Sequence, residues 1–150
     1  MSHSRSNMTR RSAVNPITIV NDLIRSADDA KNRVETIDRD IMNDEHKSTL
    51  ISGLDKVRTN ARSVIVGITT KDLDKMFTAA EEAYNAAYNT GDKIHKQSVK
   101  NHRLIGVATL FTKMEHKATL VKKMVESVHI TRRGGGTRKR RGKKGTRRRR

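Results

Sequence analysis

Apolar residues recur every three or four positions along most of this chain, which is the spacing of one face of an α-helix. The first series alternates the two spacings strictly and comprises Val20, Leu23, Ala27, Ala30, Val34, Ile37 and Ile41. Asn15 can cap the start of this helix, and Pro16 suits the first helical position because it lacks an N–H. The polar run at 43–46 is the first candidate break. We therefore predict a helix from about residue 16 to about residue 42.

Two similar series follow. The second comprises Leu50, Leu54, Val57, Ala61, Val64 and Ile68, and Gly67 marks its predicted end. The third comprises Leu73, Phe77, Ala80, Tyr84 and Ala87. Thr69 or Thr70 can cap the start of this third helix, and the side chain of Asp72, three residues after Thr69, can accept a hydrogen bond from the backbone N–H of Thr69. Thr90-Gly91 predicts its end, because glycine is favoured just past the end of a helix.

A fourth helix is predicted from about 92 to 130, with a break near Asn101 as the alternative. From residue 104 its pattern is unbroken: Leu104, Val107, Phe111, Met114, Ala118, Val121, Val125 and Val128. Further apolar residues lie outside that stripe, namely Ile105, Leu110, Leu120 and Met124. This helix is therefore either buried on more than one side or presents apolar surface to another chain.

The last twenty residues have a different composition. They contain no acidic residue and twelve basic ones: Arg132, Arg133, Arg138, Lys139, Arg140, Arg141, Lys143, Lys144, Arg147, Arg148, Arg149 and Arg150. Such a segment buries too little apolar surface to offset its ordering entropy, so we expect it to be disordered or ordered by a partner. The predicted organisation is a flexible basic arm at 1–14, a helical domain at 15–130 and a basic tail at 131–150. The predicted class is all-α, with about four helices in an elongated bundle or in helical hairpins.

Charge separates these segments further. The chain has 33 Lys and Arg against 16 Asp and Glu, yet residues 16–130 hold 18 basic and 16 acidic residues and are nearly neutral. The tail is therefore predicted to bind a polyanion, since arginine contacts phosphate oxygens bidentately. The tail contains no aromatic residue and the chain has no zinc-finger spacing, so nucleic-acid binding should be independent of base sequence.

Nothing in the sequence predicts an enzyme, a cofactor or a metal site. The chain lacks Cys, and His95 and His102 would lie about 10 Å apart along one helix, too far to share a metal. Carboxylates occur as near neighbours such as Glu81 and Glu82, but adjacent helical side chains diverge by about 100° and do not meet at a reacting atom. No apolar run is long enough to predict a membrane span.

The ending GGGTRKRRGKKGTRRRR resembles the basic tails of small virion proteins of large icosahedral DNA viruses, including minor capsid proteins beneath the outer shell. That resemblance implies a structural protein that contacts capsomers through its helices and leaves the tail for the genome or for acidic neighbours. It would place the protein in the virion; otherwise we expect an intracellular, nuclear or nucleoprotein-associated location. Two alternatives remain: a histone-like or ribosomal-type nucleic-acid-binding protein, and a protein that binds anionic lipid surfaces.

Overall fold

The computed structural model describes residues 15–137, with side chains for residues 15–128. Over this part the chain is helical and contains no strand. Its elements are α2 (Pro16–Glu35), α3 (Asp44–Thr70), α4 (Leu73–Lys100), the 3-10 turn η2 (His102–Leu104) and α5 (Ile105–Thr137). The predicted all-α class with four long helices is therefore confirmed for the described residues.

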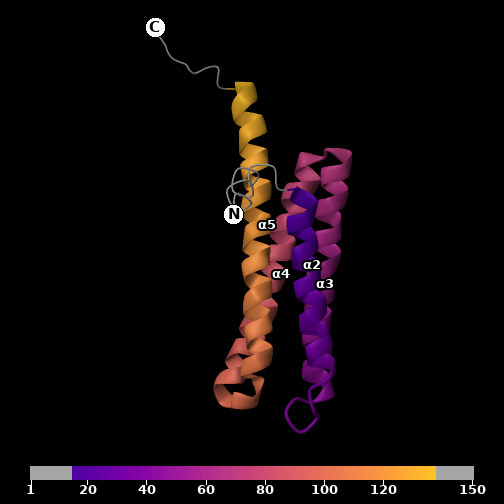
Figure 1. The fold of residues 1–150 in the computed structure, drawn as a ribbon, viewed down its shortest axis with the longest axis vertical. Helices are drawn as coiled ribbons and strands as arrows, with labels where there is room; N and C mark the ends of the chain where they lie inside the picture. Colours follow the sequence, from indigo (N-terminus) through magenta and orange to yellow (C-terminus); the bar gives the residue numbers. More distant parts are fainter. Residues whose placement is uncertain (1–14, 138–150) are drawn as a thin grey trace, which may run out of the picture.

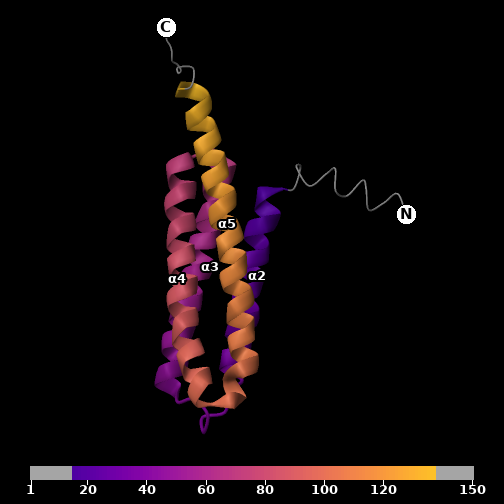
Figure 2. The same cartoon turned by 90° about the vertical axis from the view of Figure 1, so that its left-hand side faces the viewer.

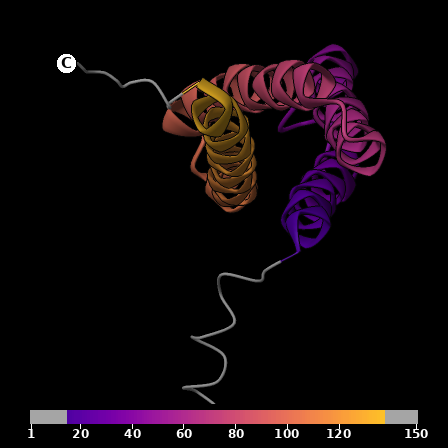
Figure 3. The ribbon, with the colours of Figure 1, turned by 90° about the horizontal axis from the view of Figure 1, so that it is seen from above.

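The four helices form an antiparallel bundle in which consecutive helices run in opposite directions (Figures 1 and 2). Within the described part, α2 packs against α3 and α5, α4 packs against α3 and α5, and the backbones of the diagonal pairs do not meet. Seen along its length, the chain follows the order α2, α3, α4, α5 around the bundle (Figure 3). The contact between α2 and α5 closes the arrangement, which makes it a bundle and not an open row of hairpins.

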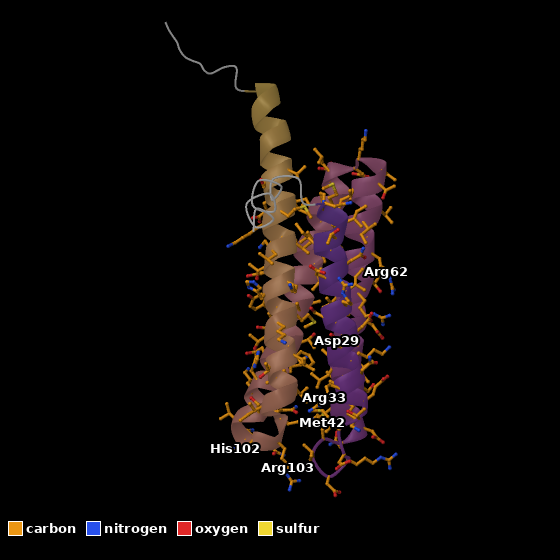
Figure 4. The ribbon with its side chains drawn as sticks, viewed as in Figure 1. Asp29, Arg33, Met42, Arg62, His102 and Arg103 are labelled. Atoms are coloured by element: carbon orange, nitrogen blue, oxygen red, sulfur yellow. The ribbon has the colours of Figure 1, made fainter. Side chains whose placement is uncertain are left out.

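The predicted stripes of α2, α3 and α5 line the interior of the bundle. Phe111 is the largest fully buried side chain, and Leu23, Leu50 and Leu54 are also within 1% of complete burial. At the base, the end of the bundle that carries the α2–α3 and α4–α5 connections, Met42 is buried under the helices (Figure 4). One continuous apolar core therefore runs along the bundle.

On α4 the buried stripe is shifted from the predicted one. The buried residues are Met76, Ala79, Ala80, Ala83, Ala87, Thr90, Gly91 and Ile94. Phe77 and Tyr84, which the pattern assigned to the central stripe, are only partly buried. Small residues occupy most of the core positions of α4, so its neighbours approach closely and the larger rings lie at the edge of the core.

The first helix ends six residues earlier than its apolar pattern suggests. α2 stops at Glu35, because the backbone N–H and the hydroxyl of Thr36 both bond to the carbonyl of Arg33. Ile37 lies beyond the helix yet is still buried, so the predicted continuation to Ile41 is wrong. The connection uses its apolar residues to cover the base of the core.

The connection between α3 and α4 also differs from the prediction. α3 continues past Gly67 to Thr70, and Lys71 then adopts a left-handed conformation with φ of 61°. The cap of α4 is Asp72, whose side chain accepts from the N–H of Lys75 at 3.1 Å, so Thr69 and Thr70 are not the caps. Gly67 is required by packing: an added Cβ would lie 2.9 Å from the backbone nitrogen of Met76.

α4 runs straight through Thr90 and Gly91, so the predicted helix end there is wrong and the alternative break at Asn101 is confirmed. Both residues lie where a neighbouring helix comes close: Thr90 faces Gly53 of α3, and Gly91 faces Glu115 of α5. A Cβ added to Gly53 would overlap the Thr90 hydroxyl, and one added to Gly91 would overlap the carboxylate of Glu115. Each of these glycines therefore lies where a side chain of the neighbouring helix fills the adjacent space.

Replacing Arg58 with methionine is expected to reduce the free energy of unfolding by about 1 kcal/mol, since a partly exposed ion-pair network is worth little more. Arg58 is 22% exposed and joins two helices: its Nε lies 2.7 Å from Asp28 on α2, and its Nη1 lies 3.0 Å from Asp55. The measurement is urea denaturation followed by circular dichroism.

The matched control is Arg62→Met, one turn along α3 on an exposed outer surface (Figure 4). A surface substitution of this kind should change stability by less than about 0.5 kcal/mol. Equal effects of the two substitutions would show that the Asp28–Arg58 contact adds nothing to the packing of α2 on α3.

Candidate polyanion-binding site

Among the described helices, the excess of positive charge is concentrated on α5. In α2, α3 and α4 the basic and acidic residues balance within one charge, whereas α5 carries six basic residues against two Glu. The six are Lys113, Lys117, Lys122, Lys123, Arg132 and Arg133. One side of a nearly neutral bundle is therefore cationic.

The C-terminal end of α5 projects beyond the other three helices (Figures 1 and 2). Two of the predicted polyanion-binding residues, Arg132 and Arg133, lie on these last turns, because α5 continues to Thr137. The expected border between helical domain and tail at 130/131 thus falls inside a helix. In the sequence, the position that follows Val125 and Val128 in the stripe is Arg132, a residue type that is rarely buried.

The other ten predicted residues lie outside the described residues: Arg138, Lys139, Arg140, Arg141, Lys143, Lys144, Arg147, Arg148, Arg149 and Arg150. The structure does show where their segment begins, because residue 138 directly follows the last residue of α5. The ten basic residues therefore continue the chain from the projecting end of that helix.

On the side of α5 that meets α4, sequence reasoning missed a polar pair. The Oε2 atom of Glu115 lies 3.1 Å from the Nε2 atom of His95, and the Glu115 side chain is only 13% exposed. The Thr112 hydroxyl lies 3.4 Å from the same nitrogen. Burial raises the pKa of the Glu115 carboxyl and Asp92 adds to the rise, although His95 acts in the opposite direction. The pair joins α4 to α5 across 20 residues of sequence, a separation that no local motif reveals.

Replacing Glu115 with glutamine is expected to remove a pH dependence of folding stability. Because the pKa of Glu115 is raised in the folded state, the unfolded chain ionises first as the pH rises. The contribution of Glu115 to the free energy of unfolding is therefore fully present below pH 4.5, the ordinary pKa of a Glu carboxyl. This contribution is lost as the pH rises through the higher pKa of the folded state. Urea denaturation across this pH range should show the wild-type protein losing stability relative to Glu115→Gln; a constant difference would contradict the assignment.

Other chemistry is not apparent in the described part of the chain. Within it, no group of three or more His, Asp or Glu side chains is arranged to hold a metal ion, and none of its helices is long and apolar enough to cross a membrane. A groove of about 830 Å³ lies between α3 and α4, lined mainly by hydroxyl and amide side chains such as Ser52, Asn85 and Asn89. Its lining also includes the carboxylate Glu82 and two lysines, Lys56 and Lys93.

No protein-family model, curated protein or solved structure matches this chain significantly. A function must therefore be inferred from the residues of the chain itself. These are the cationic helix α5, its projecting end and residues 138–150, called the basic segment below.

Proposed function

We propose that this protein is a non-enzymatic structural component of a larger assembly, with a helical body that packs against partner proteins and a cationic C-terminal segment that binds nucleic acid. A minor capsid or virion protein is the form of this role that the tail composition favours. The observation that carries the proposal is the excess of basic residues on α5, along one side of an otherwise nearly neutral bundle, together with the basic sequence at 131–150 that ends the chain.

The projecting helix supports this role mechanically. A helix is stiff over its length, so α5 holds the beginning of the basic segment away from the bundle, where a polyanion can approach without touching α2, α3 or α4. The interaction would be electrostatic and independent of base sequence, because phosphates supply the charge and carry no sequence information.

Exposed apolar residues support packing of the body against partner proteins. Val99 is 81% exposed and Ile105 is 54% exposed. They flank the connection between α4 and α5, which lies at the base, opposite the projecting end of α5 (Figure 4). The same connection also carries the exposed cations Lys100 and Arg103, so this end of the molecule combines apolar side chains with positive charge.

The alternative is a histone-like or ribosomal-type protein in which the basic segment carries the whole function and the bundle only presents it. The same charge distribution supports this role. The histone-like alternative differs because it requires no partner protein at the base. Substituting Val99 and Ile105 with serine would then leave the binding of the protein to nucleic acid unchanged.

Salt titration of the full chain on a random-sequence DNA duplex tests nucleic-acid binding. If half of the twelve basic residues of 131–150 contact phosphates, log Kd should change by about 5 for each tenfold change in salt. Failure to bind duplex or single-stranded DNA at low salt would exclude nucleic acid. The basic segment would then be assigned to acidic surfaces of partner proteins.

A further inference from the structure

The two tyrosines of the chain form a cluster with a lysine on the surface between α4 and α5. The rings of Tyr84 and Tyr88 have centroids 4.7 Å apart and are tilted by 47°. The ammonium of Lys122 lies 4.2 Å from the centre of the Tyr84 ring, and the Tyr88 hydroxyl is hydrogen-bonded to Thr119 at 3.0 Å. Residues from two helices, far apart in the sequence, are therefore held together in one arrangement.

Core packing accounts for Tyr84, which packs against the edge of the core, but not for Tyr88. Ala80, Ala83 and Ala87 fill the core face of α4, and Tyr84 lies beside that face, only partly buried. Tyr88 is 40% exposed. Its hydroxyl is held by Thr119 and one side of its ring is backed by Tyr84, so its orientation is restrained while part of the ring meets solvent.

An exposed, restrained aromatic ring, backed by a second ring that carries an ammonium group, has the chemistry that recognises an unpaired nucleobase. The base stacks on the ring, and the lysine neutralises the adjoining phosphate. Lys123, which is exposed, adds a second charge on α5. A duplex does not meet this requirement, because its bases already stack on one another and hide their faces.

The cluster lies on a line that leads to the basic segment. Position 133 follows position 122 by eleven residues, or about three helical turns, so the two positions share one face of α5. The path from Lys122 to Thr137 is about 22 Å long at the rise of an α-helix. A single strand can therefore run along this face of α5 from the tyrosines to Arg133, passing one carboxylate, Glu126, one turn beyond Lys122.

We propose that Tyr88, backed by Tyr84, is a stacking site for an unpaired base whose strand is neutralised by Lys122 and Lys123 of α5, so that the protein binds single-stranded nucleic acid along α5. This inference rests on the proposed nucleic-acid function and deepens it. The site would give single strands a preference over duplex without reading base sequence, since every base has an aromatic face.

Fluorine NMR of the full chain labelled with 3-fluorotyrosine tests the site directly, because two tyrosines give two signals. An oligothymidylate should shift the Tyr88 signal to saturation, and a duplex of equal charge bound through the basic segment should not. Binding of the oligothymidylate, measured separately by anisotropy, with no shift of either signal would overturn the stacking site while leaving the proposed function intact. Absence of binding to both DNAs would overturn both proposals.

Replacing Tyr88 with leucine should weaken oligothymidylate binding by about 10-fold, the low to middle range for loss of one stacked base, and leave duplex affinity unchanged. The matched control is Leu120→Ala, since Leu120 is also 40% exposed and lies on α5. Thermal melting of each variant checks that the bundle is folded. Equal loss for single strand and duplex, or no loss for either, would overturn the proposal.

Discussion

A chain that ends at Thr137 is expected to bind duplex DNA at least about 1,000-fold more weakly than the full chain at 50 mM salt. The truncation leaves α5 whole and removes ten of the twelve basic residues of 131–150. Each phosphate contact releases a counterion, so the loss of about five contacts should also lower the salt slope from about 5 to about 1. Anisotropy titrations over a series of salt concentrations measure both quantities.

Two full-length controls separate charge from length. Replacing the ten basic residues of 138–150 with glutamine should reproduce the effect of truncation, because charge and not chain length supplies the affinity. Arg132→Gln with Arg133→Gln should lower the slope by only about 1, since two charges supply at most about two contacts. A truncated chain with an unchanged slope would place the binding surface on the bundle and contradict the proposed role of the basic segment.

Replacing Phe111 with alanine is expected to reduce the free energy of unfolding by about 3–5 kcal/mol. Phe111 is completely buried and is the largest side chain in a core made chiefly of Val, Leu and Ala. Few neighbours are large enough to move into the space that its ring would leave, so both the lost burial and the cavity contribute. Because small domains have a total stability of about 5–15 kcal/mol, this is a large fraction. Urea denaturation followed by circular dichroism measures it.

The control for Phe111 is Val99→Ala, a substitution of an 81% exposed residue at the end of α4. It should change stability by less than about 0.5 kcal/mol. A loss below about 1 kcal/mol for Phe111→Ala would contradict the position of α5 in the core, because no fully buried phenylalanine can be truncated at so small a cost.

Local pattern was enough to predict the class of this fold and most of its core. Val20, Leu23, Val57, Val64 and Val121 are all buried as their spacing indicates, because residues three or four apart on a helix face the same side in any fold. The basic composition of 131–150 is likewise a property of the chain alone. In α2, α3 and α5 the predicted stripe is therefore the buried one, whereas on α4 the buried stripe is shifted.

Helix ends, the face of α4 and the candidate sites depended on contacts between distant residues. Ile37 keeps its burial outside a helix, and Gly91 lies in mid-helix beneath the Glu115 side chain of α5. His95 meets Glu115, and Tyr84 meets Lys122, only when α4 and α5 are side by side. Periodicity reports which residues share a side of one helix, but it carries no information about which helix will be its neighbour or how closely the two will approach.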